Sequence, residues 1–185
     1  MKNLVFVTSN VGKVAEAKVR FSRLGYAVVQ QDLGYPEIQA DSLQEVAVYG
    51  VECVRQRLSS MFFLEDSGIF IAGLKGFPGV YSKYVFQTIG LPGVLRLMEG
   101  CVDRSAVFRS VIGYLEPGGV PRVFVGECPG VLSLEVRGSH GFGYDPIFVP
   151  DGWGKTFGEV STVEKNVVSH RGKSLDLLAG FLKSL

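Results

Sequence analysis

The beginning of the chain alternates between strand and helix patterns in an order typical of α/β proteins. Residues 4–8 form a short apolar run, which predicts a buried strand. Between residues 14 and 24 the apolar positions recur with helical spacing, and Gly25 stands where a left-handed residue ends a helix. A second strand is predicted over 27–31. The chain therefore opens with strand, loop, helix and strand, which indicates an α/β fold.

The clearest helix is predicted over residues 42–59, where the apolar positions fall on one face. After it, residues 62–64 and 69–71 are apolar and predict two short strands. The four residues between them, Glu65-Asp66-Ser67-Gly68, are polar and end in glycine. We expect these four residues to form a tight turn that keeps the two carboxylates at the end of a strand.

The second half of the chain combines helical turns with a strand-rich region. Residues 76–84 are punctuated by glycine and proline and are followed by helical turns as far as Met98. Residues 105–116 and 121–127 are rich in β-forming residues and predict a hairpin, and residues 131–136 predict a further strand. The sequence as a whole predicts a mixed α/β fold with a substantial antiparallel portion.

The end of the chain predicts an irregular segment and a last helix. Residues 137–146 are too rich in glycine for a regular element. A helix follows near the C-terminus, and its expected core positions are Leu175, Leu178, Ala179 and Leu182.

Length, charge and cysteine content restrict the class of protein. The 185 residues are enough to bury one complete core, so we predict a single domain over 1–185. A net charge of +1 argues against a nucleic-acid duplex or a membrane surface as a partner. The opening apolar run is too short for a signal peptide or a membrane span. Three widely spaced cysteines indicate reduced thiols and a cytoplasmic protein.

The segment TSNVGK joins the first predicted strand to the first helix and is a candidate phosphate-binding loop. It comprises Thr8, Ser9, Asn10, Val11, Gly12 and Lys13. Exposed N–H groups at a helix start, together with a lysine, suit phosphate oxygens. The segment lacks the spacing of a Walker loop. An equally good interpretation is a simple helix N-cap formed by Ser9 or Asn10.

Two acidic segments are candidates for a metal site. Asp66 and its neighbour Glu65 precede Ser67, and Glu37 lies in a separate loop. Magnesium prefers one or two carboxylates together with water and phosphate oxygens, which these residues can provide. Taken alone, the Glu65-Asp66 pair is more often a solvated turn.

The segment GFGYDP places two aromatic side chains beside a carboxylate in a glycine-rich stretch. Phe142 and Tyr144 can sandwich a flat ring, and Asp145 can accept hydrogen bonds from it. The alternative is that both aromatic rings belong to the core and that Asp145 begins a turn before Pro146.

A group of basic residues lies near the C-terminus and includes one of only two histidines. These residues are Lys165, His170, Arg171 and Lys173. Ser169 is adjacent to His170, so their side chains diverge and cannot form a nucleophile and base pair. The chain also has no G-x-S-x-G elbow. A catalytic serine is therefore excluded, which leaves a helix cap or a wall that grips an anionic ligand.

These stretches together resemble one known family. TSNVGK, the PE of YPEIQAD, EDSG, GFPGVYS, GFGYDP, EKN and SHRGK occur in this order from residue 4 to about residue 180. Each motif alone is weak, but the seven in order resemble the inosine triphosphate pyrophosphatase family, whose members remove deaminated purine triphosphates. The resemblance implies an elongated central mixed β-sheet with two α/β lobes, an active-site cleft between them, and a homodimer.

The resemblance also implies roles for individual residues. Residues 8–13 match the triphosphate-binding loop, Glu37 matches a metal ligand, and Asp66 matches both a metal ligand and the catalytic base. The matching substrate contacts are Ser67, Phe142, Gly143, Tyr144, Asp145, Lys165, His170 and Arg171, with Phe142 as the stacking ring. Tyr144 stands where many relatives have tryptophan.

The implied reaction is Mg²⁺-dependent hydrolysis of ITP, dITP and XTP to the monophosphate and pyrophosphate. A nucleotide monophosphatase or kinase would need a nucleophile or a second phosphate acceptor site, and the sequence indicates neither. A non-catalytic nucleotide or RNA-binding module is disfavoured because paired carboxylates repel a phosphate backbone unless a metal is present.

Overall fold

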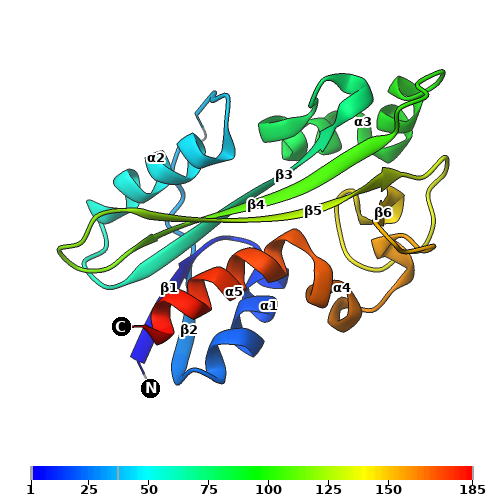
Figure 1. Cartoon of the computed structure of the whole chain (residues 1–185). Helices are drawn as coiled ribbons and strands as arrows, with labels where there is room; N and C mark the ends of the chain where they lie inside the picture. Colours follow the sequence, from blue (N-terminus) through cyan, green and yellow to red (C-terminus); the bar gives the residue numbers. More distant parts are fainter. Residues whose placement is uncertain (1, 37, 185) are drawn as a thin grey trace. The chain divides into compact units, whose positions relative to one another are not determined.

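The computed structural model describes residues 2–36 and 38–184, in which strands and helices alternate (Figure 1). The strands are β1 (Lys2–Val7), β2 (Tyr26–Gln31), β3 (Phe62–Ile71), β4 (Ser105–Leu115), β5 (Arg122–Leu132) and β6 (Phe148–Pro150). The α-helices are α1 (Val11–Ser22), α2 (Leu43–Arg55), α3 (Ser82–Leu97), α4 (Thr162–Val168) and α5 (His170–Lys183). Short 3₁₀ turns are η1 (Ala72–Leu74), η2 (Gly79–Tyr81), η3 (Asp145–Ile147) and η4 (Phe157–Glu159).

The strands form a six-stranded sheet in the order β2-β1-β3-β4-β5-β6. β1 pairs in parallel with both β2 and β3, whereas β5 and β6 pair antiparallel. A sheet with both kinds of pairing, combined with helices, confirms the predicted mixed α/β class.

The chain divides into two compact units, and each unit is built from separate stretches of sequence. Unit 1 contains Met1–Asp66, Ser110–Gly126 and Arg171–Leu185, whereas unit 2 contains Ser67–Arg109 and Glu127–His170. The chain passes from one unit to the other within β3, β4 and β5, and again after His170, the first residue of α5.

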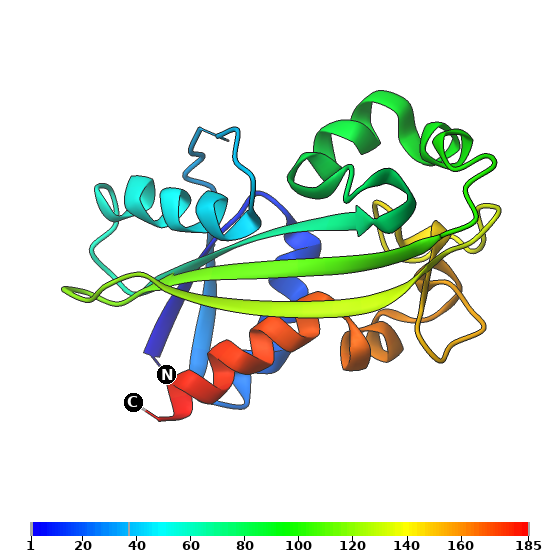
Figure 2. The ribbon, with the colours of Figure 1, turned by 45° about the horizontal axis from the view of Figure 1, so that its top comes forward.

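In unit 1, helices cover both faces of the sheet (Figure 2). Helices α1 and α5 lie on one face and α2 lies on the other. Strand β4 shows how its alternating side chains serve both faces. Ile112 and Tyr114 belong to the core cluster that includes the apolar residues of α1 and α5, while Gly113 lies against Val51 of α2. The four predicted core positions of the last helix are all buried in this unit.

Unit 2 has its own core, built from α3, the second half of β3 and the segment around β6. Ile69, Val94, Phe148 and Phe157 are among its fully buried members. The predicted helical turns as far as Met98 are confirmed as α3, which has a break at Gly90, where φ is 62°.

The tight turn predicted at residues 65–68 is wrong. These residues lie inside β3, which runs without interruption from Phe62 to Ile71. A buried carboxylate within a strand normally carries a large desolvation cost, but Glu65 has cationic partners that offset it. Gly68 serves close packing instead of a turn, because a Cβ at this position would collide with the carbonyl oxygen of Gly79.

The separate strand predicted over 131–136 is also wrong. β5 runs from Arg122 to Leu132, so residues 121–127 and 131–132 belong largely to one strand, and residues 133–136 are not regular. Pro129 and Gly130 lie inside β5, although both residue types are rare in strand interiors. A Cβ at Gly130 would collide with the carbonyl oxygen of Val149, so the glycine permits β6 to pair closely.

The longest helix is α3, with 16 residues. Within residues 2–36 and 38–184, no helix has the length and apolar character that crossing a membrane requires.

Candidate functional site

The loop after β1 ends in a helix N-cap. Asn10 is the N-cap of α1, and its Oδ1 accepts a hydrogen bond of 3.1 Å from the backbone N–H of Lys13. The hydroxyl of Thr8 accepts a bond of 3.1 Å from the N–H of Asn10. The N-cap interpretation of this segment is therefore confirmed for Asn10, and Lys13 lies in the first turn of a 12-residue helix. This turn combines a positive side chain with the partially positive end of the helix.

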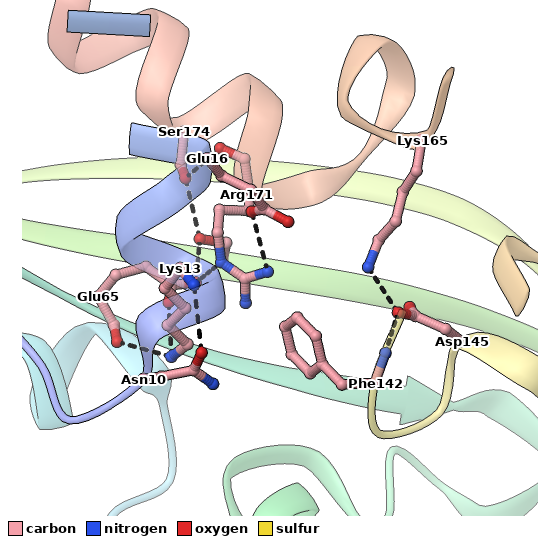
Figure 3. Close-up of polar contacts among 10 residues, drawn as sticks. Asn10, Lys13, Glu16, Glu65, Phe142, Asp145, Lys165, Arg171 and Ser174 are labelled. Carbon is pink, nitrogen blue, oxygen red and sulfur yellow. Dashed lines mark hydrogen bonds and ion pairs between the residues drawn. The ribbon is translucent and has the colours of Figure 1, made fainter. Parts of the chain in front are cut away.

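Lys13 lies directly beside the acidic stretch of β3. Its Nζ is 2.6 Å from Oε2 of Glu65 and donates a hydrogen bond of 3.2 Å to the backbone carbonyl of Glu65 (Figure 3). That carbonyl belongs to the peptide that links Glu65 to Asp66. Tertiary structure therefore brings together two stretches, TSNVGK and EDSG, that the sequence indicated separately.

Glu65 is the centre of a buried polar cluster in unit 1. Its Oε1 is 3.2 Å from Nε of Arg171 and accepts a hydrogen bond of 2.6 Å from the hydroxyl of Ser110. An Nη atom of Arg171 also donates a bond of 3.4 Å to Oε2 of Glu16. Two carboxylates thus face two cations, so these four side chains together carry no net charge.

The surroundings of Glu65 keep it ionised. Burial alone would raise its pKa, but the charges of Arg171 and Lys13, with hydrogen bonds from Lys13 and Ser110, lower the pKa well below the usual range. Glu65 therefore remains a negative partner for both cations throughout the neutral pH range.

Asp66 and Ser67 follow in the same strand and are both half-buried. Because consecutive side chains of a strand point to opposite faces, Asp66 faces away from the side on which Glu65 meets its cations. The oxygens of Glu65 are held by cationic partners. Glu37 lies outside the described residues. Within residues 2–36 and 38–184, no three His, Cys, Asp or Glu side chains form a group that could hold a metal ion.

In unit 2, a buried ion pair lies beside an exposed aromatic ring. Asp145 is only 2% exposed and accepts hydrogen bonds from Nζ of Lys165 at 2.6 Å and from the backbone N–H of Phe142 at 2.8 Å. The Lys165 ammonium lies 4.8 Å from the centre of the Phe142 ring and 5.4 Å from that of Phe157. Phe142 is itself 42% exposed, so a large apolar face is available beside a fixed positive charge.

Glycine makes this local geometry possible. Gly141 has φ of 75°, and a Cβ there would collide with the Asp145 carboxylate. Gly143 also has a positive φ, 62°. Both residues occupy the left-handed region that favours glycine.

The two aromatic residues of GFGYDP have different surroundings. Tyr144 is buried, donates a hydrogen bond of 2.7 Å from its hydroxyl to the carbonyl of Ser82, and packs against Phe86. Burial raises the pKa of Tyr144 well above its usual value. The core interpretation therefore describes Tyr144, while Phe142 presents its ring to solvent.

The first two residues of α5, His170 and Arg171, are buried and do not form an exposed cap. His170, 3% exposed, stacks on Phe108 with ring centres 4.5 Å apart and an angle of 10° between the planes. Arg171, 2% exposed, belongs to the Glu65 cluster. His170 belongs to unit 2 and Arg171 to unit 1. Lys173 is exposed and Ser169 forms the C-cap of α4.

A model of the Ham1 family matches residues 4–181 of this chain. The chain belongs to the Ham1 family. A "dITP/XTP pyrophosphatase" of Thermococcus kodakarensis is 53% identical over 180 residues, which cover 97% of each sequence. A protein with the same name from Methanopyrus kandleri is 50% identical over 181 residues, covering 98% of this chain and 96% of the relative. The family resemblance inferred from the seven motifs is thereby confirmed.

Solved structures agree with the family assignment. The Ham1 protein of Staphylococcus aureus has a TM-score of 0.87 at 29% identity, with 99% of each chain covered. A HAM1 protein from Coxiella burnetii has the same TM-score at 30% identity and covers 100% of both chains. The mixed α/β fold of this Ham1 family chain is therefore shared with experimentally determined structures.

Sequence patterns did not indicate several buried residues that contact the charged side chains of this Ham1 family protein. Glu16, Ser110 and Ser174 are buried and bind the charged residues, but none was singled out. One signal was present for Ser110, since it alternates with the apolar residues Phe108 and Ile112 on one side of a predicted strand. A hydroxyl on an otherwise apolar face indicates a buried polar partner.

Proposed function

We propose that this chain is a Mg²⁺-dependent pyrophosphohydrolase that converts ITP, dITP and XTP to the monophosphate and pyrophosphate, and so removes non-standard purines from the nucleotide pool. The names of its relatives support this activity. The observation that carries the proposal is the contact of Lys13 with the backbone carbonyl between Glu65 and Asp66, because it joins the candidate phosphate-binding loop to the strand that carries the candidate base. The test is release of pyrophosphate from ITP, measured with and without Mg²⁺.

The loop after β1 is proposed to bind the triphosphate. Thr8, Ser9, Asn10, Val11 and Gly12 would supply hydroxyl, amide and backbone N–H donors, and Lys13 would supply a full positive charge. The helix start adds a favourable dipole. Because these donors act on phosphate oxygens, they are expected to treat all purine triphosphates alike.

Asp66 is proposed as the catalytic base. Its carboxylate would orient a water molecule for in-line attack on the α-phosphorus and accept the proton, with pyrophosphate as the leaving group. No covalent intermediate is required. Mg²⁺, when bound through Asp66 and Glu37, would neutralise the charge that develops on the phosphate oxygens. The half-buried carboxylate of Asp66 suits this ion, which prefers one or two carboxylates and completes its shell with water and phosphate.

Glu37→Gln is expected to raise the Mg²⁺ concentration required for half-maximal rate. The amide keeps the shape of the side chain but loses its charge, and so weakens metal binding without removing the base. A Mg²⁺ titration of pyrophosphate release would measure this, and titration with Mn²⁺ followed by electron paramagnetic resonance would measure binding independently of turnover. An unchanged metal requirement in both measurements would remove Glu37 from the metal site.

The purine is proposed to stack on Phe142, whose exposed ring is already positioned by its backbone bond to Asp145. Asp145 and Lys165, with Gly143 and Tyr144, would complete the base-binding segment, and Ser67 would contact the substrate beside Asp66. Hypoxanthine and xanthine have an oxygen at C6, where adenine has an amino group. Guanine shares this oxygen but has an amino group at C2. Fixed donors near C6 and C2 would therefore accept the first two bases and disfavour the others.

Arg171→Ala is expected to lower the preference for ITP over GTP and ATP, beyond any general loss of rate. We propose that Arg171 and His170 supply the donors that read the purine edge. A guanidinium carries only N–H donors and keeps its charge at any working pH, which suits it to purine oxygens. The measurement is kcat/KM for ITP, XTP, GTP and ATP with wild type, Arg171→Ala and His170→Ala. Equal loss on all four nucleotides would show that these residues do not read the base.

Two other functions make different predictions in the same assay. A nucleotide monophosphatase would release orthophosphate, and a kinase would transfer a phosphoryl group to an acceptor, so neither would release pyrophosphate. A non-catalytic nucleotide or RNA-binding module would bind ITP without turnover. The identity of the released phosphate therefore separates all three.

Further properties of the protein are proposed on the resemblance. We propose that it acts in the cytoplasm as a homodimer of single-domain chains. Residues 77–97 in unit 2 support an interface, because large apolar side chains are exposed there, namely Phe77, Tyr81, Tyr84, Phe86, Ile89 and Leu97. Light scattering of the purified protein measures the assembly directly.

A further inference from the structure

A closed set of contacts surrounds the carboxylate of Glu65. Oε1 meets Nε of Arg171 at 3.2 Å and the hydroxyl of Ser110 at 2.6 Å. Ser110 is 2.9 Å from the hydroxyl of Ser174, which in turn donates a bond of 3.1 Å to the backbone carbonyl of Arg171. Glu65, Ser110, Ser174 and Arg171 thus form a ring, which we call the Glu65 ring. All four residues belong to unit 1 and all are buried.

The direction of each hydrogen bond in the ring follows from the chemistry of its members. The carboxylate of Glu65 only accepts, so the single proton of Ser110 is committed to Glu65. Ser110 must then accept at its contact with Ser174. The proton of Ser174 is shared between Ser110 and the carbonyl of Arg171. The hydroxyl of Ser110 both donates and accepts, whereas that of Ser174 donates, and neither serine has solvent as an alternative partner because both are 0% exposed.

The ring determines which oxygen of Glu65 is presented to Lys13. Oε1 is held by the Ser110 hydroxyl and Arg171, which fixes the plane of the carboxylate. Oε2 is thereby directed to the ammonium of Lys13 at 2.6 Å. The Lys13 side chain is long and flexible, and its position depends on this contact and on the carbonyl of the same residue.

We propose that Ser110 and Ser174 are positioning residues that hold Glu65 in one orientation and so place the Lys13 ammonium for phosphate binding. The inference rests on the phosphate-binding role proposed for Lys13. Glu65 is, in this proposal, a counter-ion that orients a cation and does not bind the metal. The hydroxyls act through Glu65 and have no contact with the substrate.

The test measures binding of inorganic tripolyphosphate by calorimetry, without a base and without turnover. Ser110→Ala is expected to weaken binding by about tenfold, which corresponds to the lower end of the range for loss of one hydrogen bond to a charged group. The KM for ITP should rise by the same factor while kcat changes less. Ser174→Ala should give a smaller effect of the same kind. Either change breaks the ring. The double variant should therefore bind tripolyphosphate as well as Ser110→Ala does, within experimental error.

A matched control comes from a buried hydroxyl elsewhere. Thr156 is 0% exposed and donates a bond of 2.7 Å to the carbonyl of Arg137 in unit 2. Thr156→Val also removes a buried hydroxyl, and its effect on stability should be similar to that of Ser110→Ala. Thr156 has no contact with Glu65. It is expected to lower the melting temperature and leave tripolyphosphate binding unchanged. If Ser110→Ala does not fold, Ser174→Ala provides the same comparison.

The possible outcomes are distinct. The positioning role is overturned if Ser110→Ala binds tripolyphosphate with the wild-type affinity. It is also overturned if the affinity of Ser110→Ala falls only as far as that of Thr156→Val. A wild-type protein that binds no tripolyphosphate also overturns it. If wild type binds tripolyphosphate and Ser110→Ala weakens that binding, but no purine triphosphate is hydrolysed, the ring is supported and the proposed function fails.

Discussion

Asp66→Asn is expected to remove nearly all turnover of ITP while leaving the fold intact. The amide keeps the shape of the side chain but can neither accept the proton of the attacking water nor offer a negative ligand to Mg²⁺. General-base contributions are typically about 10²–10⁴-fold, and the loss of metal charge adds to this. Asp66 is half-buried in β3, and the substitution preserves the size of its side chain, so the fold is expected to be retained. Initial rates of pyrophosphate release at saturating Mg²⁺ measure the effect.

The control is the same chemical change at an exposed acid. Asp151 lies in a turn of unit 2, and Asp151→Asn is expected to keep the wild-type rate. Thermal unfolding of both variants would establish that the proteins are folded. An Asp66→Asn protein that retained more than roughly a tenth of the wild-type rate would contradict the assignment of Asp66 as base.

Lys13→Ala is expected to lower kcat/KM by roughly 10²-fold for every nucleotide, without changing which base is preferred. The estimate corresponds to the upper range for a hydrogen bond to a charged group, since the ammonium would contact the triphosphate in both the substrate and the transition state. The same four nucleotides used for Arg171 provide the measurement. An altered base preference with an intact rate would place Lys13 elsewhere in the site.

Loss of Lys13 also affects stability, and this must be separated from the effect on binding. The variant leaves the buried carboxylate of Glu65 with one cation fewer, so a lower melting temperature is expected. Lys18 lies on the same helix but is exposed, and Lys18→Ala should leave both rate and stability near wild type. Rates measured well below the melting temperature of Lys13→Ala then report the phosphate contact alone.

Much of the fold could be predicted because it depends on local patterns. The spacing of apolar residues predicted α1, α2 and α5, and the residues expected to be buried in α5 are buried. The N-cap at Asn10 depends on a side chain that bonds a backbone group three residues away. Such features are visible in a short window of sequence, because every group that takes part lies within it.

The continuous strand β3 could not be predicted in this way. Two carboxylates and a glycine between apolar runs indicate a turn wherever counter-ions are absent. Here Glu65 is neutralised by Lys13, which lies 52 residues earlier in the chain, and by Arg171 near the C-terminus. No local pattern shows that these two cations lie beside Glu65. Judged by its own residues, segment 65–68 is too polar for the interior of a sheet.

The sequence by itself determined the family, the class of fold and the residues that supply charge and aromatic rings, because motifs and periodicity survive without knowledge of distant contacts. Tertiary structure alone decided the roles of neighbouring residues: Glu65 became a buried counter-ion while Asp66 stayed half-buried, and Tyr144 entered the core while Phe142 kept an exposed ring. Tertiary structure also brings Ser110 and Ser174, which are 64 residues apart, into hydrogen-bond contact. The physical reason is that the cost of burying a charge or a hydroxyl is set by the partners that folding brings within hydrogen-bond distance.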